Sequence, residues 1–422
     1  MIRHTRKFGQ YNKLTTHKFV PASQSLQAMK GMMIRMKKDL ELYIHIPFCA
    51  RKCNYCDFLS APANQEEMLK YTDFLCKEIK SQGSLPLGYR VVSIFFGGGT
   101  PSLLSLEQLG RIYNTIQECF EIVSACEITI ECNPGTVTKD KLLGYYNLGI
   151  NRLSFGLQSA NNEELRLLGR IHTFEEFIEN YGHAREVGFR NINVDLMSAL
   201  PYQTLETYEA TLKKVLKLNP EHLSAYSLIL EEGTPFYDRF LEPGEEKDAI
   251  PEVALDRVMY QYTKKILRSH GYHRYEISNY AKPGKECLHN IGYWNRVDYL
   301  GLGLGASSLL NHVRYRNMDT IAAYEKAITS SMGVKQEEEQ LSKKEEIEEF
   351  MFLGLRLSKG VSKNEFKQQF LVSLDEIYGP KLVTLQTAGL LMVHEDQVFL
   401  TDRGIDVSNQ VLSEFLLDEI LP

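Results

Sequence analysis

The sequence has no apolar run approaching the ~20 residues that a helix needs to cross a bilayer, which argues against an integral membrane protein. Its eight cysteines in 422 residues are too few and too scattered for the disulfide framework of a small secreted protein. Tryptophan occurs once, at Trp294. With 43% apolar and 24% charged residues, the composition is ordinary for a folded chain. We therefore expect a protein of the reducing cytoplasm, long enough for two or three domains.

Charge is distributed unevenly along the chain. Residues 1–40 hold nine Lys or Arg but one acid, Asp39. A basic, acid-poor N-terminus is typical of an organellar transit peptide or a nucleic-acid-binding arm. Methionines crowd up to Met36, however, where a bacterial chain would ordinarily begin. We expect residues 1–40 to be a disordered basic extension.

From residue 41 to about 235, one pattern recurs: a short apolar or β-branched run, a polar loop, then a segment with helical periodicity. The runs are residues 42–46, 91–96, 127–131, 152–157, 192–197 and 222–228. Alternating strands and helices form right-handed βαβ units with a parallel sheet. Six units predict a partial (β/α)6 TIM-type barrel, open on one side, with its site at the carboxyl ends of the strands.

Three thiols follow the first of these strands with the spacing CxxxCxxC: Cys49, Cys53 and Cys56. Three thiolates can hold a [4Fe-4S] cluster and leave one iron without a protein ligand. A zinc site would need a fourth Cys or His close by. The neighbouring rings of Phe48, Tyr55 and Phe58 would shield a cluster from water, so we favour the iron–sulfur cluster.

This motif, after YIHIPF, resembles the radical S-adenosylmethionine (SAM) superfamily, in particular the branch that contains oxygen-independent coproporphyrinogen III oxidase and the haem chaperone HemW. In that superfamily the open iron binds SAM, and one electron from the cluster cleaves it. The resemblance implies a [4Fe-4S] cluster and SAM as cofactors. It extends from residue 41 to about 420.

Further motifs stand at the ends of the predicted strands, among them FFGGGTP, TIECNPG, RLSFGLQS and NINVDLMS. Glycines let a backbone approach a ligand closely, and an acid on an apolar strand is costly unless it is paired. By resemblance, Gly98, Gly99 and Thr100 hold the methionine end of SAM. The remaining SAM contacts implied by the family are Tyr43, Tyr55, Glu131, Gln158, Arg170 and Asp195.

Two features separate the members of this branch. The oxidase pattern continues to CxxxCxxCxC, whereas this chain has Phe58 at the last position. Residues 289–294 read HNIGYW, similar to the haem-associated HNxxYW signature of HemW. Histidine can ligate haem iron, and Tyr and Trp offer flat faces to a porphyrin. The resemblance makes His289 the candidate haem ligand. We expect the glycine-rich residues 298–308 to form a close-packed backbone covering the barrel mouth, which the resemblance makes part of the SAM and porphyrin pocket.

Residues 336–422 read as a separate, mainly helical module of winged-helix type. A nucleic-acid-binding face would be basic, yet residues 341–422 carry eight basic and fourteen acidic side chains. We expect no nucleic-acid partner. The predicted division is therefore a basic extension over 1–40, the barrel over 41–235, an extension with HNxxYW over 236–335, and the C-terminal module.

The resemblance favours a haem chaperone that binds haem, the cluster and SAM and delivers haem to client haemoproteins, among them respiratory enzymes at the membrane. If SAM is cleaved, an electron donor such as flavodoxin or ferredoxin is implied. The alternative is an enzyme: oxygen-independent coproporphyrinogen III oxidase, or another radical SAM conversion of a tetrapyrrole. Because Phe58 replaces the further cysteine, oxidase activity is not expected. The expected location is the cytoplasm.

Overall fold

The computed structural model describes residues 37–83, 85–241 and 246–417. The basic extension predicted over residues 1–40 lies almost wholly outside them. The fold begins at β1, Lys38–Ile46, four residues before the predicted strand. Leu40 is fully buried, and an Asp39–Arg90 ion pair of 2.6 Å joins β1 to the neighbouring strand. Because of this burial and pairing, residues 38–40 belong to the strand and not to the expected extension.

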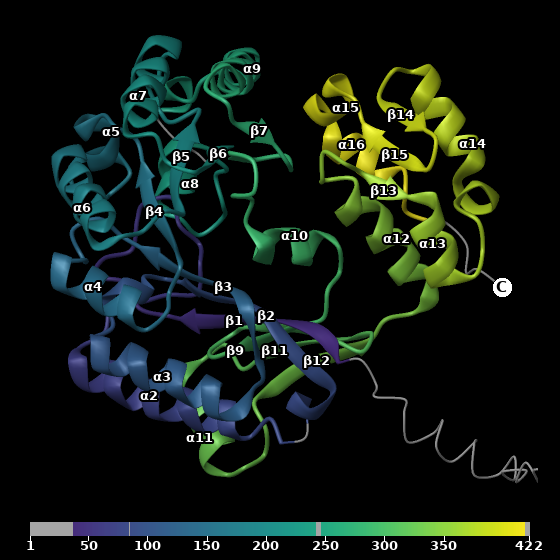
Figure 1. Ribbon diagram of the computed structural model, residues 1–422. Coiled ribbons are helices and arrows are strands. Elements are labelled where there is room, and N and C mark those ends of the chain that lie inside the picture. Colours follow the sequence, from purple (N-terminus) through teal and green to yellow (C-terminus); the bar gives the residue numbers. More distant parts are fainter. Residues whose placement is uncertain (1–36, 84, 242–245, 418–422) are drawn as a thin grey trace, which may run out of the picture. The chain divides into compact units, whose positions relative to one another are not determined.

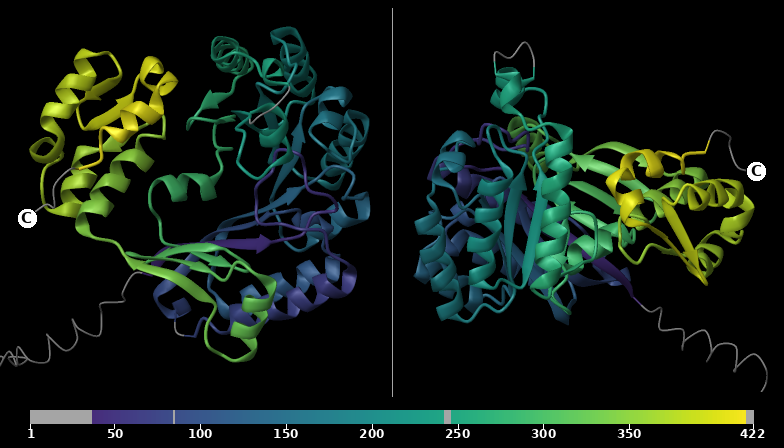
Figure 2. Two further views of the ribbon diagram at one scale, coloured as in Figure 1. Left: turned by 180° about the vertical axis from the view of Figure 1, so that it is seen from behind. Right: turned by 90° about the horizontal axis from the view of Figure 1, so that it is seen from above.

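Six parallel strands form the predicted barrel wall (Figure 1). They are β1, β2 (Tyr89–Gly98), β3 (Ile122–Cys132), β4 (Arg152–Gln158), β5 (Ile192–Ser198) and β6 (His222–Ser227). The intervening helices are α2 (Gln65–Lys80), α3 (Leu106–Cys119), α4 (Lys139–Asn147), α5 (Asn162–Leu167), α6 (Phe174–Val187) and α7 (Leu205–Leu218). These helices cover the outer face of the curved sheet (Figure 2). The alternation of strands and helices in the sequence is confirmed.

The sheet does not close, because neither β1 nor β6 pairs with the other. Instead, residues 273–340 extend both edges. On the β1 side lie β9 (Tyr299–Leu302), β10 (Ser307–Leu310), β11 (Val313–Asn317) and β12 (Lys335–Gln340). On the β6 side lie β8 (Asn279–Ala281) and β7 (His273–Arg274). The open barrel predicted from the sequence is thus confirmed, with edge strands that the repeat pattern did not reveal.

The helices of this middle segment are α8 (Pro235–Phe240), α9 (Val253–Ser269), α10 (Leu288–Trp294) and α11 (Ile321–Thr329). Its glycine-rich run packs against α2. A Cβ on Gly303, whose φ is +101°, would lie 2.4 Å from the Tyr71 hydroxyl. The Gly303 N–H donates to the buried carboxylate of Glu78 at 2.8 Å. Gly303 therefore serves helix–sheet packing, which agrees with the expected close-packed backbone. A contribution of the run to the SAM and porphyrin pocket stays a prediction.

The C-terminal module has a hydrophobic core of its own. Its elements are α12 (Lys343–Gly354), β13 (Val361–Ser362), α13 (Lys363–Phe370), α14 (Leu374–Thr387), β14 (Leu391–His394), β15 (Gln397–Leu400), α15 (Asp402–Asp406) and α16 (Ser408–Ser413). The hairpin β14–β15 pairs with β13 in an antiparallel sheet, which lies against α12, α13, α14 and α15. This is the winged-helix arrangement that the sequence predicted.

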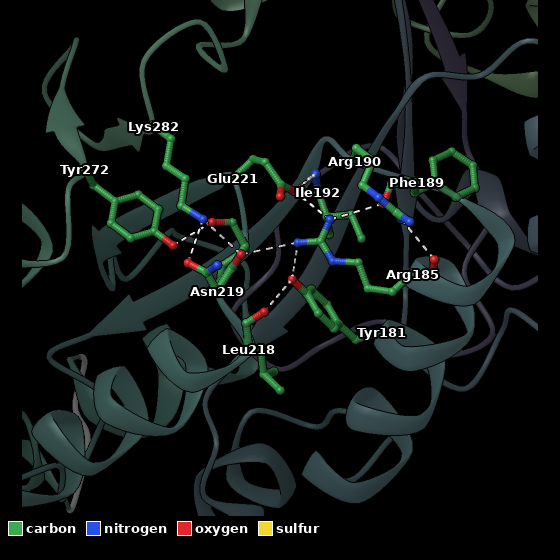
Figure 3. A network of polar contacts seen from close by, with 11 residues as sticks. Tyr181, Arg185, Phe189, Arg190, Ile192, Leu218, Asn219, Glu221, Tyr272 and Lys282 are labelled. Atoms are coloured by element: carbon green, nitrogen blue, oxygen red, sulfur yellow. Dashed lines mark hydrogen bonds and ion pairs between the residues drawn. The ribbon is translucent and has the colours of Figure 1, made fainter.

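A polar network fixes where β5 and β6 begin (Figure 3). The Glu221 carboxylate accepts hydrogen bonds from Arg185 Nη1 at 2.8 Å and from the Ile192 N–H at 3.1 Å. Tyr181, one turn before Arg185 on α6, donates to the Leu218 carbonyl at 3.0 Å. Glu221 is the residue directly before β6, and its carboxylate thus bonds both α6 and the first residue of β5.

We predict that Glu221→Ala lowers the free energy of unfolding by about 2–3 kcal/mol, because it leaves a charged donor and a backbone N–H without their acceptor. Urea unfolding of the purified protein measures this. Glu186→Ala is the matched control, since its ion pair with Lys139 is exposed on both sides and contributes little. Equal stability of the two variants would contradict a structural role for the network.

Candidate functional site

A pocket of about 450 Å³ lies at the carboxyl ends of the parallel strands. Its wall contains every residue predicted for the cluster and for SAM except Tyr43. They are Cys49, Cys53, Tyr55, Cys56, Gly98, Gly99, Thr100, Glu131, Gln158, Arg170 and Asp195. Residues from five strands and their following loops, distant in sequence, therefore meet in one cavity.

The three motif cysteines lie on the loop after β1 with their side chains partly buried. Thr100 Oγ1 lies 3.6 Å from Cys49 Sγ, and Arg170 Nη1 donates to Cys53 Sγ at 3.4 Å. Burial raises the pKa of Cys56, and the nearby Cys53 and Cys49 thiolates add to the shift. Donors aimed at two of the sulfurs fit thiolate ligands, which carry negative charge.

The arrangement of these thiols does not suit a single ion. Within the described residues, no three or more His, Cys, Asp or Glu side chains are grouped to hold one metal. In a [4Fe-4S] cluster each thiolate binds a different iron, so the sulfurs stand farther apart than the ligands of one ion. A cluster with three cysteine ligands therefore fits this loop better than zinc.

Backbone and side-chain contacts hold the cysteine loop to α5. The Asn54 N–H donates to the Leu168 carbonyl at 3.0 Å, and Asn54 Nδ2 donates to the Leu167 carbonyl at 2.8 Å. Phe48 is buried, as a shield for a cluster requires. Phe58 is 63% exposed, so the prediction that its ring shields the cluster is wrong. It lies at the rim of the pocket instead.

The glycine run at the end of β2 is required by packing. A Cβ on Gly98, at φ +111°, would lie 2.6 Å from the His45 ring. A Cβ on Gly99 would lie 2.6 Å from the Phe48 carbonyl oxygen. The Gly98 N–H donates to Glu131 at 3.2 Å. The run therefore lets β2 lie against the cysteine loop and leaves bare backbone at the pocket wall.

Two carboxyl groups, those of Glu131 and Asp195, line this wall. Burial raises the pKa of Glu131 to about 8, and the neighbouring Asp195 contributes. The pKa of Asp195 is also raised by burial, although Asn193 Nδ2 donates to it at 2.7 Å. Buried acids of this kind gain most from a cationic or hydrogen-bond-donating ligand. An ammonium group or ribose hydroxyls meet that requirement.

Arg170 lines the same pocket, between the two carboxyl groups and the cysteines. Besides Cys53, it donates to Asn133 Oδ1 at 3.0 Å and to the Gly156 carbonyl. Gln158, with φ +73°, accepts from the Tyr226 hydroxyl at 3.1 Å. Asn133 and Tyr226 both line the pocket and were missed by sequence reasoning. Their positions directly after β3 and near the end of β6 were the available signal.

Tyr43 and His289 lie outside the pocket wall, one level deeper in the barrel. The Tyr43 hydroxyl lies 3.2 Å from His45 Nδ1, and its ring stacks on Phe95. His289 stacks on the same Phe95 with centroids 5.1 Å apart. Its Nδ1 lies 2.8 Å from Ser93 Oγ, so Nε2 is the nitrogen that would bind an iron. Burial lowers the pKa of His289 to about 3, which keeps the imidazole neutral, as a ligand must be.

The two aromatic residues of HNIGYW, Tyr293 and Trp294, make other contacts than His289 does. Tyr293, 41% exposed, lies against Tyr299 with centroids 5.1 Å apart. The Arg356 guanidinium of the C-terminal module lies 4.5 Å from the centre of the Trp294 ring. Helix α10 therefore reaches from the barrel interior to the C-terminal module.

The fold and this pocket define a radical SAM protein. A model of the radical SAM superfamily matches residues 43–215, and a model of the HemN C-terminal domain matches residues 341–407. The chain belongs to this superfamily, so its cofactors are a [4Fe-4S] cluster and SAM. No described helix has the length and apolar character needed to traverse a bilayer.

Within the superfamily, the chain belongs to the HemW family. It is 37% identical over 390 residues to the heme chaperone HemW of Lactococcus lactis, covering 91% of this chain and 99% of the relative. Identity to the Bacillus subtilis heme chaperone HemW is 36%, over 89% of this chain and 98% of the relative. The solved coproporphyrinogen III oxidase (HemN) of Escherichia coli superposes with a TM-score of 0.80 at 26% identity, covering 90% of each chain.

Proposed function

We propose that this protein is a haem chaperone, which binds haem and delivers it to client haemoproteins with the help of the cluster and SAM. The observation that carries the proposal is the pairing of a complete radical SAM pocket with Phe58 at its rim, in the place of the oxidase's further cysteine. The names of the relatives at 36–37% identity support it.

In this proposal Cys49, Cys53 and Cys56 hold the cluster, which supplies an open iron for SAM and an electron. The chain's own residues position SAM. Gly98, Gly99 and Thr100 offer backbone and hydroxyl groups at the end of β2. The charged and polar groups of the wall come from Glu131, Gln158, Arg170 and Asp195. Tyr55 closes the pocket beside the cysteines, and Tyr43 lies beneath it.

The proposed haem site includes α10. His289 is neutral, with Nδ1 held by Ser93, which fixes the ring and leaves Nε2 for an iron. The exposed face of Tyr293 would contact the porphyrin. Because His289 is 9% exposed, haem binding at this residue requires α10 to shift away from β2.

Partners and boundaries follow from the same proposal. Clients would be haemoproteins in or facing the cytoplasm, including respiratory enzymes, and an electron donor such as flavodoxin or ferredoxin would serve SAM cleavage. The acidic C-terminal module supports the absence of a nucleic-acid partner. The proposed division is 41–235, 236–340 and 341–422, where the last boundary moves from the expected residue 336 because β12 pairs with β11 in the barrel sheet. The middle segment supplies strands to both edges of that sheet.

The second candidate, oxygen-independent coproporphyrinogen III oxidation, is favoured by the TM-score of 0.80 to the Escherichia coli oxidase. Anaerobic reconstitution followed by parallel assays separates the two. We predict that the protein binds haem with a ligand-dependent Soret band that weakens or shifts in His289→Ala. We also predict no protoporphyrinogen from coproporphyrinogen III with SAM and a reductant.

The control for His289→Ala is His270→Ala, which removes an exposed imidazole at the end of α9. A Soret band indifferent to His289 would remove this residue as the ligand. Robust conversion of coproporphyrinogen III would replace the chaperone by the enzyme.

A further inference from the structure

Below the SAM pocket, the barrel interior is filled by polar side chains. The inner residues of the strands include Glu41, Ser93, Glu127, Arg152 and His222, all of which are buried. Such a layer is costly unless its groups satisfy one another. Helix α10 and the residue before it close this layer from the side of the middle segment.

One continuous chain of hydrogen bonds crosses the layer from Asp195. Asn193 Nδ2 donates to Asp195 Oδ1 at 2.7 Å and to Ser154 at 2.8 Å. Because the amide nitrogen is used in this way, Asn193 Oδ1 is the acceptor for His222 Nδ1 at 2.6 Å. On the other side of the ring, His222 Nε2 lies 2.8 Å from the Tyr275 hydroxyl.

The direction of these bonds is fixed by chemistry. Burial and the nearby Arg152 charge lower the pKa of His222 well below its usual value, so the ring is neutral. A neutral imidazole with its proton on Nδ1 accepts at Nε2. Tyr275 therefore donates to His222, and its oxygen accepts the Cys287 N–H at 3.3 Å. Every donor in the chain points toward Asp195.

The far end of this chain is the start of α10. Cys287 Sγ donates to Glu127 Oε1 at 3.4 Å, and the next two backbone N–H groups, of Leu288 and His289, donate to the same carboxylate at 3.1 and 3.2 Å. Gly292 lies directly on Glu41, since a Cβ there would lie 2.0 Å from Glu41 Oε1. The helix that carries HNIGYW is thus held by the layer that also holds Asp195.

We propose that Asn193, His222 and Tyr275 are positioning residues that couple SAM binding at Asp195 to the placement of α10. Aligned hydrogen bonds polarise one another, so a donor from SAM that competes for Asp195 changes the strength of each bond down to Cys287. Binding of SAM and placement of α10 are then linked, and the linkage is reciprocal. The extension to haem affinity rests on the proposed function.

Hydrogen exchange of the reconstituted protein tests the coupling without haem. SAM is added anaerobically without reductant, so that it stays intact, and exchange is followed in peptides spanning residues 286–296. We expect exchange to slow about fivefold or more in the wild type, the lower end of typical couplings between sites. In Tyr275→Phe the change should fall below about twofold, while SAM still binds.

Tyr208→Phe is the matched control, because it also removes the hydroxyl of a buried tyrosine, one that is bonded to Thr263 at 2.8 Å and lies outside the chain of bonds. It should respond to SAM as the wild type does. Exchange over α10 that is indifferent to SAM in the wild type would overturn the proposal, whether or not Tyr275→Phe folds. An unchanged response in folded Tyr275→Phe would overturn it as well.

A second arm measures haem affinity with and without SAM. We expect a shift of about fivefold or more in the wild type and in Tyr208→Phe, and its loss in Tyr275→Phe. A wild type that binds no haem would contradict the proposed function, and the exchange result would then decide the coupling by itself. A haem shift that persists in Tyr275→Phe would contradict the coupling.

Discussion

Replacing any one of Cys49, Cys53 and Cys56 by alanine is expected to abolish the iron–sulfur absorbance of the reconstituted protein. Each thiolate binds a different iron, and a cluster that keeps two protein ligands loses its anchorage at one corner. Anaerobic reconstitution, followed by absorption spectroscopy and iron and sulfide analysis, measures the loss. SAM binding should disappear with the cluster, because the open iron is part of its site.

The other five cysteines provide the controls. Alanine at Cys76, Cys119, Cys126, Cys132 or Cys287 should leave the absorbance unchanged. Cys132 is the most informative of them, since it lines the same pocket, yet it is buried with its Sγ 3.8 Å from the Ile130 carbonyl oxygen. Burial also raises its pKa, which disfavours the thiolate that a ligand must be. Loss of the cluster in any of these five would contradict the assignment.

The second large effect concerns SAM. Asp195→Ala and Glu131→Ala should each weaken SAM binding about 10- to 100-fold, the cost of losing a hydrogen bond to a charged group. The cluster should remain, because neither carboxylate contacts a motif cysteine in the described structure. Equilibrium dialysis with SAM and cluster quantification on the same samples measure both quantities.

Glu78→Gln is the matched control for these substitutions. Glu78 is a buried carboxylate on α2 that accepts from Gly303 and Asn317, outside the SAM pocket. Its substitution should leave SAM affinity unchanged. Unaltered affinity in both Asp195→Ala and Glu131→Ala would show that SAM binds elsewhere.

The barrel could be predicted because its signals are local. Each strand of the wall is a short apolar run followed by a polar loop and an amphipathic helix, and that order alone implies parallel pairing. The middle segment carries no such signal. Strands as short as Asn279–Ala281 and His273–Arg274 are defined by their pairing, the first with β6 and the second with the first, and such pairing is a tertiary contact.

The site residues likewise divide into those that the sequence reveals and those that depend on tertiary contacts. The cysteines and Glu131 stand at strand ends and Asp195 lies within β5. The fold brings these distant positions together, so motif order indicates one pocket. Phe58 was misjudged because the side of the loop on which its ring lies is set by the backbone path after Cys56. The hydrogen-bonded layer beneath Asp195 could not be foreseen, since its bonds join residues up to 196 positions apart.

The measurement that tests the chaperone function most directly is the transfer of haem to a client. The reconstituted protein is loaded with haem, freed of excess haem, and mixed anaerobically with the apo form of a respiratory haem enzyme, with haem-loaded albumin as the passive donor. We predict that the client gains activity faster from this protein than from albumin, and that His289→Ala transfers less. Transfer no faster than from albumin, together with conversion of coproporphyrinogen III, would contradict the account.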